Sequence, residues 1–158
     1  MNRIAAQQMG LTRRDRGMLA VAIVLDISFY SASDTVVSGA DLAERTGMVR
    51  RTLEPLLQAL SRERVLDSTR GPHGGYRLGR PARLLKVADV IAIGLASLED
   101  NGIDLSGRLQ NAVVEPLWAE FDDAISAIAG SLTIEDLLKR AAKAGLRRPI
   151  SEPLNFVI

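Results

Sequence analysis

Apolar residues recur at helical spacing through the first part of the chain. Between Leu19 and Tyr30 they come three or four positions apart, the interval that places side chains on one face of an α-helix. Thr12 and Asp15 have the spacing of an N-cap residue and its partner, so we expect this helix to begin near Thr12. Its buried stripe should consist of Leu19, Ala22, Ile23, Ile27 and Tyr30, widened by Met18, Val21 and Leu25.

The next apolar pattern predicts two helices joined by a tight turn. Ser38 and Asp41 form a second cap pair, and the short helix that follows them should end at Gly47. A longer helix should then span residues 50–64. Its inner face is marked by Leu53, Leu56, Leu57 and Leu60. A short helix, a glycine turn and a second helix have the spacing of a helix-turn-helix motif.

A proline bears on where the second of these helices begins. Pro55 has no N–H to donate, which costs a helical hydrogen bond unless the proline lies in the first turn. We therefore expect the helix to start near Arg51. That start leaves Arg50, Arg51 and Thr52 at the helix N-terminus, where main-chain N–H and guanidinium groups can meet phosphates or base edges.

Residues 68–80 read as a basic β-hairpin. The Gly74-Gly75 pair should supply the positive φ values of a tight turn. Tyr76 and Leu78 alternate with Arg77, as in a strand with one packed and one wet face. A hairpin directly after a helix-turn-helix predicts a winged helix, so we expect a mainly α fold with a small β-hairpin wing.

The rest of the chain predicts three further helices. A short one ends near Ser97, a long one spans residues 108–129 with Pro116 as a kink or a new start, and a last one follows a Thr133–Asp136 cap pair to Gly145. We divide the chain into a winged helix-turn-helix domain (11–96), a linker loop (97–107), a dimerisation helix with the C-terminal helix (108–146) and an extended tail (147–158). The long helix carries an apolar stripe of Leu109, Val113, Leu117, Phe121, Ile125 and Ile128.

Charge is unevenly distributed along the chain. Residues 50–86 contain nine basic and three acidic residues, whereas the remainder contains eleven basic and sixteen acidic ones. A basic block within an acidic remainder favours a local nucleic-acid surface, and a solvated charged face is the plainer alternative.

Composition excludes several classes of function. The 158 residues include no cysteine and one histidine, so thiolate metal sites, disulfides and cysteine nucleophiles are excluded. We find no metal-ligand cluster and no phosphate-binding glycine loop before a helix, and we expect no cofactor and no enzymatic activity. The sequence shows no run of signal-peptide type and none long enough to span a bilayer, so we expect a cytoplasmic protein without a membrane partner.

Three motifs together resemble the IscR-like Rrf family of bacterial winged-helix regulators. The segment Arg-Gly-Pro-His-Gly-Gly-Tyr-Arg-Leu at residues 70–78 resembles the family's wing, and Thr-Leu-Glu-Pro at residues 52–55 resembles part of its recognition helix. Leu-Thr-Ile-Glu-Asp-Leu at residues 132–137 resembles its C-terminal end. The resemblance implies a homodimer that crosses its long helices and binds a partly palindromic promoter site, and we expect a transcriptional repressor.

The resemblance and the basic pattern together give candidate site residues. Arg70 would enter a minor groove, and Glu54 would lie near bases. The candidate DNA-binding set is Arg14, Arg50, Arg51, Thr52, Glu54, Arg70, His73 and Arg77, and the apolar stripe of the long helix is the candidate dimer interface.

The chain also departs from the family pattern. Members that sense iron, redox state or nitric oxide place cysteines in the loop before the long helix, and residues 97–108 contain none. An iron–sulphur cluster therefore does not carry over to this chain. The chain has Thr52 where the family commonly has an aromatic residue, Val49 where it commonly has a capping serine and His73 where it commonly has a glycine. These replacements bear on whether the family's base preferences apply to this chain.

Several interpretations stay open from the sequence. His73 is either a phosphate contact or a solvated loop residue, and Glu54 either reads a base or orients a neighbouring arginine. Glu99, Asp100 and Asp104 are either solvated acids or a weak cation site. The alternative function is a winged-helix module that controls a partner protein, and the signal is either a small-molecule effector, a partner protein or DNA occupancy alone.

Overall fold

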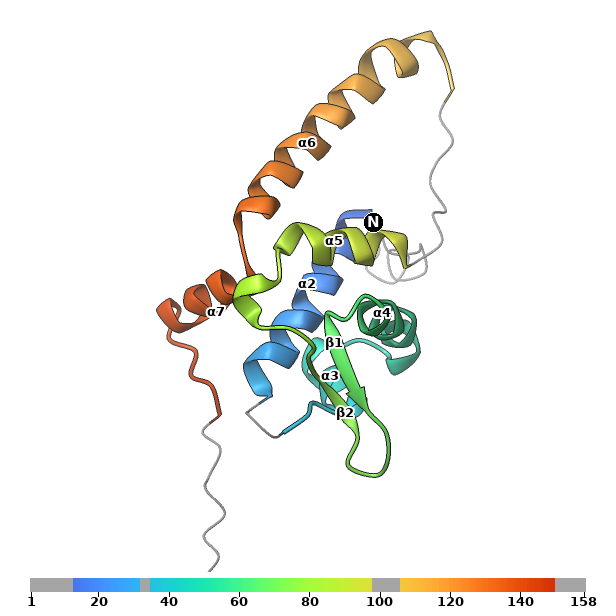
Figure 1. Ribbon diagram of the computed structural model, residues 1–158. Coiled ribbons are helices and arrows are strands. Elements are labelled where there is room, and N and C mark those ends of the chain that lie inside the picture. The colour runs from blue at the N-terminus through green and yellow to red at the C-terminus, as the bar shows by residue number, and fades with distance from the viewer. Residues whose placement is uncertain (1–12, 32–34, 98–105, 150–158) are drawn as a thin grey trace, which may run out of the picture.

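A computed structural model describes residues 13–31, 35–97 and 106–149 of the chain. The described elements are mostly helices, with one antiparallel two-stranded hairpin, which confirms the expected fold class (Figure 1). In chain order they are α2 (Arg13–Tyr30), α3 (Gly39–Thr46), α4 (Arg50–Arg62), β1 (Leu66–Thr69), β2 (Gly75–Leu78), η1 (Ala82–Leu84), α5 (Val87–Ala96), η2 (Gln110–Val114), α6 (Glu115–Ser131) and α7 (Ile134–Lys143).

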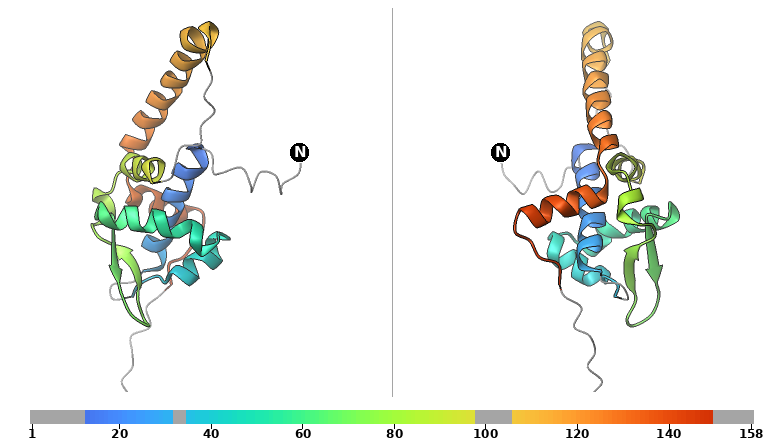
Figure 2. Two further views of the ribbon diagram at one scale, coloured as in Figure 1. Left: turned by 90° about the vertical axis from the view of Figure 1, so that its right-hand side faces the viewer. Right: turned by 60° about the vertical axis from the view of Figure 1, so that its left-hand side comes forward.

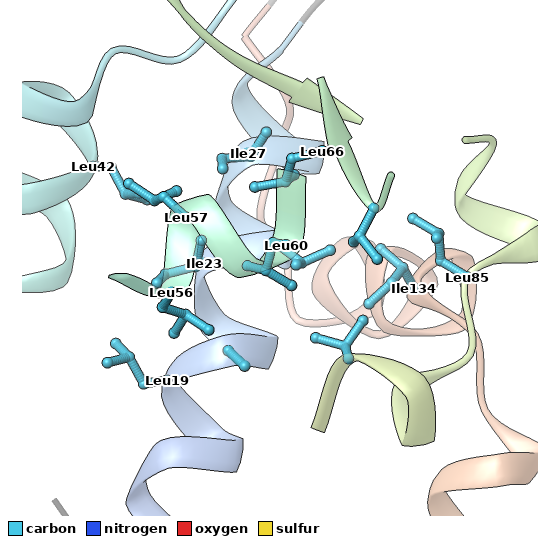
Figure 3. Packing of buried hydrophobic residues seen from close by; sticks show 14 of the residues in the cluster. Leu19, Ile23, Ile27, Leu42, Leu56, Leu57, Leu60, Leu66, Leu85 and Ile134 are labelled. Carbon is cyan, nitrogen blue, oxygen red and sulfur yellow. The ribbon is translucent and has the colours of Figure 1, made fainter. Parts of the chain in front are cut away.

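The hydrophobic core lies around α2. Ile23 and Ile27 of α2 are fully buried, and so are Leu56 and Leu60 of α4 on the neighbouring face (Figure 3). These leucines follow the expected inner face of α4. Buried side chains from β1, α5 and α7 join the same cluster, so the winged-helix elements share one core.

The buried face of α2 agrees only in part with the expected stripe. Leu19, Ile23 and Ile27 are buried as expected, and Ala20 and Val24 are buried as well, whereas Met18, Ala22 and Tyr30 are exposed. The cause is α5, which packs closely along α2. A Cβ at Gly94 of α5 would meet the Ala20 side chain and the Arg16 carbonyl, so the absence of a side chain there permits the approach.

After α6 the chain returns to the core. The Val87 N–H donates to the Leu132 carbonyl at 3.0 Å, and the Ile134 N–H donates to the Leu85 carbonyl at 2.9 Å. Ile134 is fully buried in the common core. Thr133 and Asp136 form the expected capping box at the start of α7. Hydrogen bonds from the Thr133 N–H and hydroxyl lower the pKa of the Asp136 carboxyl.

The long helix α6 projects away from the other elements (Figures 1 and 2). The apolar stripe is exposed along η2 and α6, from 40% at Leu117 of α6 to 78% at Leu109, the residue before η2. Pro116 is the second residue of α6, and the π-helical η2 runs directly into α6, so the change from π- to α-helix falls next to this proline. No helix in the described ranges is long and apolar enough to cross a membrane.

Candidate DNA-binding surface

The helix-turn-helix is built from local signals that the sequence shows. The Asp41 N–H donates to the Ser38 hydroxyl oxygen at 3.1 Å at the start of α3. Gly47 ends α3 with φ of 66°, the left-handed conformation that favours glycine. The expected short helix and glycine turn are confirmed.

A polar clamp fixes α3 against α2. Arg45 of α3 donates from Nη2 to Asp26 Oδ1 at 2.7 Å and from Nε to Asp26 Oδ2 at 2.9 Å. The same guanidinium lies 4.1 Å from the centre of the Tyr30 ring. The hydrogen bond to Asp26 raises the pKa of Arg45. No local sequence pattern indicates this clamp, because it joins residues that only the tertiary fold brings together.

Helix α4 begins one residue earlier than expected. Arg50 is its first residue, and Val49 precedes it as an N-cap without a side-chain hydrogen bond. Because valine offers no side-chain acceptor, the Thr52 N–H donates to the Val49 carbonyl at 2.8 Å. Pro55 therefore lies inside the helix, and the expectation that it falls in the first turn is wrong. As a proline, it cannot donate to the Arg51 carbonyl.

The start of α4 presents basic side chains to solvent. Arg50 and Arg51 are exposed, and Thr52 is half-buried. Arg50 Nε lies 3.6 Å from Glu54 Oε1, one helical turn further along. Glu54 is thus placed to orient Arg50, while a contact between Glu54 and a base stays a prediction.

The hairpin is anchored to the core at its base. Leu66 pairs with Leu78, and Leu66 is buried. Tyr76 is half-buried against the core and forms a β-bridge with Val37, in the segment before α3. Hydrogen bonds of 2.8 Å join the main chains of Val37 and Tyr76 in both directions. Tyr76 therefore lies on the packed face of β2, as we expected.

The glycines of the wing act differently from our expectation. The positive φ belongs to Gly71, at 113°, and not to Gly74 or Gly75. A Cβ on Gly74 would collide with the Thr69 carbonyl oxygen, and one on Gly75 would collide with the Val37 carbonyl oxygen. The Gly74-Gly75 pair therefore permits close approach of backbones, and the turn conformation depends on Gly71.

The wing carries exposed basic side chains. Arg70 and His73 are exposed in the loop that joins β1 to β2, and Arg77 on β2 has its Nε 4.0 Å from Asp67 Oδ2. The hairpin tip projects beyond the neighbouring helices (Figures 1 and 2). Arg14 is in the first turn of α2, and its side chain lies outside the described part of the structure.

Comparison with known proteins identifies close likenesses. Residues 13–140 match the family model Rrf2, described as "Iron-dependent Transcriptional regulator". The HTH-type transcriptional regulator IscR of Xenorhabdus nematophila is 33% identical over 133 residues, covering 78% of this chain and 77% of that protein. The IscR of Vibrio campbellii is 32% identical over 127 residues, covering 78% of this chain and 75% of that protein.

Solved structures show the same fold. The structure of T. potens IscR superposes with a TM-score of 0.61 at 29% identity, covering 90% of this chain and 96% of that chain. CymR of B. subtilis superposes with a TM-score of 0.60 at 23% identity, covering 79% of this chain and 94% of that chain.

The donor set of this chain does not fit a thiolate-bound iron centre. The sequence contains no cysteine, and His73, its single histidine, lies on the wing. Within the described ranges, histidine and acidic side chains form no group of three that could hold a metal ion. Glu99, Asp100 and Asp104 lie outside the described residues.

The family match spans the helix-turn-helix, the wing and the long helix in one continuous stretch. Relatives above 30% identity align with 78% of the chain, and these relatives are transcriptional regulators rather than enzymes. The chain belongs to the Rrf2 family of winged-helix transcriptional regulators.

Proposed function

We propose that this chain binds promoter DNA as a homodimer, with α4 in the major groove and the wing in the adjacent minor groove. The observation that carries the proposal is the exposure of arginines on both of these DNA-reading elements, α4 and the wing. Arg50 and Arg51 are exposed at the start of α4, and Arg70 is exposed in the wing loop. A helix of this kind fits the major groove, and a guanidinium group suits a narrow minor groove.

The two elements have different tasks in this proposal. Arg51 and Thr52 contact base edges or phosphates in the major groove, with Glu54 orienting Arg50. Arg70 enters the minor groove, while His73 and Arg77 contact phosphates beside it. Phosphate contacts fix the register of the protein on the duplex, and contacts with base edges and groove shape give sequence preference.

Dimerisation through α6 follows from its uncovered apolar stripe. Phe121 and Ile125 are 49% and 56% exposed, and Trp118 packs beside Phe121 with ring centres 5.5 Å apart. Burial of such a stripe against a second copy removes apolar surface from water at about 25 cal/mol per Å². A two-fold dimer presents two identical winged-helix domains, which suits a partly palindromic site.

We propose repression as the mode of regulation, because a dimer that occupies promoter DNA excludes other proteins from it. The regulator works in the cytoplasm without an iron–sulphur cluster, since the chain supplies no thiolate ligand. Its signal then comes from a small-molecule effector, from a partner protein or from DNA occupancy alone.

Duplex binding across a series of salt concentrations tests the proposal. With about four phosphates neutralised per subunit, the dimer should give a log–log slope of roughly −7. Arg70→Ala should weaken binding and relax the preference for a narrow, A·T-rich minor groove. Arg140→Ala, on exposed α7, removes the same charge elsewhere and should leave binding unchanged. A flat salt dependence, or normal binding by Arg70→Ala, would contradict the proposal.

A further inference from the structure

A polar hollow lies between the end of α4 and the hairpin. Its volume is about 390 Å³. β1 follows α4 after a short turn and packs against it. The hollow is lined by Ser61 and Arg64 from the end of α4 and its turn, and by Leu66, Asp67, Ser68, Thr69 and Arg77 from the two strands.

Arg64 holds an uncommon backbone conformation at the edge of this hollow. Its φ is 55°, and it is the one non-glycine residue of the described part with positive φ. The Val65 N–H donates to the Leu60 carbonyl at 3.0 Å, so Arg64 occupies the position after the helix where glycine is usual. An arginine there costs more backbone strain than a glycine and places a guanidinium group beside the hairpin. The expected helix to Arg64 therefore stops at Arg62.

The charges of the hollow suit a singly charged anion. Arg64 and Arg77 bring two positive charges, and Asp67, 4.0 Å from Arg77, brings one negative charge. Ser68 and Thr69 also line the hollow, and both residues are exposed. A phosphodiester carries one negative charge, whereas a phosphate monoester carries roughly −1.5 to −2 at neutral pH. The net charge of the lining therefore fits a phosphodiester better.

Duplex geometry supplies the phosphodiester. When a helix lies in the major groove and a wing in the adjacent minor groove, the sugar–phosphate backbone that separates the grooves passes between them. The hollow lies at the corner where the C-terminal end of α4 meets the two strands of the wing. We propose that it binds a backbone phosphate of this DNA strand, with Arg64 and Arg77 as the charged contacts. This inference rests on the proposed placement of α4 and the wing.

Arg64→Gly is the sharpest test, because it separates binding from folding. Glycine relieves the positive φ, so the variant of the full chain should melt at the wild-type temperature or above it. Its salt slope on duplex DNA should become shallower by about 1 per subunit, or about 2 for the dimer. The affinity loss should be equal for a preferred duplex and an unrelated one, because a phosphate contact carries no base information.

Arg83→Ala is the matched control. Arg83 is exposed on η1, outside the hollow, so its removal tests whether any lost charge gives the same effect. We expect a wild-type slope. An Arg64→Gly variant with the wild-type slope, or a loss confined to the preferred duplex, would overturn the inference. If the DNA affinity of the wild type itself does not depend on salt, the proposed function fails. If the wild type and Arg64→Gly show the same steep salt dependence, only the proposed phosphate binding in the hollow is refuted.

A second measurement distinguishes the two sources of phosphate. Melting of the wild type and of Arg64→Gly in millimolar inorganic phosphate should shift both proteins equally. If inorganic phosphate stabilises only the wild type while Arg64→Gly keeps its DNA affinity, the hollow binds free phosphate and the inference is wrong.

Discussion

Single residues decide how the wing is attached. Gly75 lies where β2 passes the main chain of Val37, and the paired hydrogen bonds between Val37 and Tyr76 depend on that approach. Gly71 has another task, since its φ of 113° shapes the loop in open space. Glycines of one hairpin thus serve two physical purposes, which the sequence does not distinguish.

Gly75→Ala tests the close approach. The added methyl group must displace the Val37 carbonyl, which breaks the bridge to Tyr76. We expect a loss of about 3 kcal/mol in the free energy of unfolding, measured by denaturant titration at fixed protein concentration. Gly130→Ala, in α6 with no atom within 4 Å of the new methyl group, should cause no loss. Equal stabilities of the two variants would refute the role given to Gly75.

Residue-level features were predictable from the sequence where they are local. The cap pairs Ser38–Asp41 and Thr133–Asp136 need only a spacing of three residues, and both are present. The Asp26–Arg45 clamp joins two helices, so no local pattern reveals it. The strained Arg64 was missed for the opposite reason, because a sequence rule expects glycine at such a turn.

Among the elements, helix periodicity predicted existence better than orientation. The inner face of α4 was correct because one core covers it. On α2 the prediction was correct for Leu19, Ile23 and Ile27 and wrong for Ala22 and Tyr30. The buried face also includes Ala20, because α5 approaches α2 closely at Gly94. The start of α4 differed by one residue because the helix accommodates Pro55 in its interior, whereas the prediction placed it in the first turn. The expected N-cap Thr12 and the segments 98–105 and 150–158 lie outside the described residues.

Phe121→Asp tests the stripe of α6 as the dimer interface. A carboxylate placed in a symmetric apolar contact would be buried without a partner, at a cost of several kcal/mol per copy in rough terms. We expect the variant to be monomeric in light scattering at micromolar concentration. Ala119→Asp, exposed away from the stripe, adds the same charge and should leave the dimer intact. A monomeric wild type under these conditions would show that α6 is not a dimerisation helix.

The whole molecule joins its reading elements and α6 through one core. Ala129 near the end of α6 and Ile134 at the start of α7 are buried in the cluster that also holds Leu53 and Leu56 of α4. Pairing of two α6 helices would therefore fix the distance between the winged-helix domains of the two subunits. Such a dimer should recognise two half-sites at a set spacing on one face of the duplex.

Enrichment of duplexes from a random pool by the full-length wild type tests this claim most directly. The account requires recovered sequences with two inverted half-sites, their centres separated by about one helical turn of 10–10.5 base pairs or a multiple of it. A preference for A·T pairs should appear where the wings enter the minor groove. Recovery of a single asymmetric site, or no enrichment at low salt, would contradict the account.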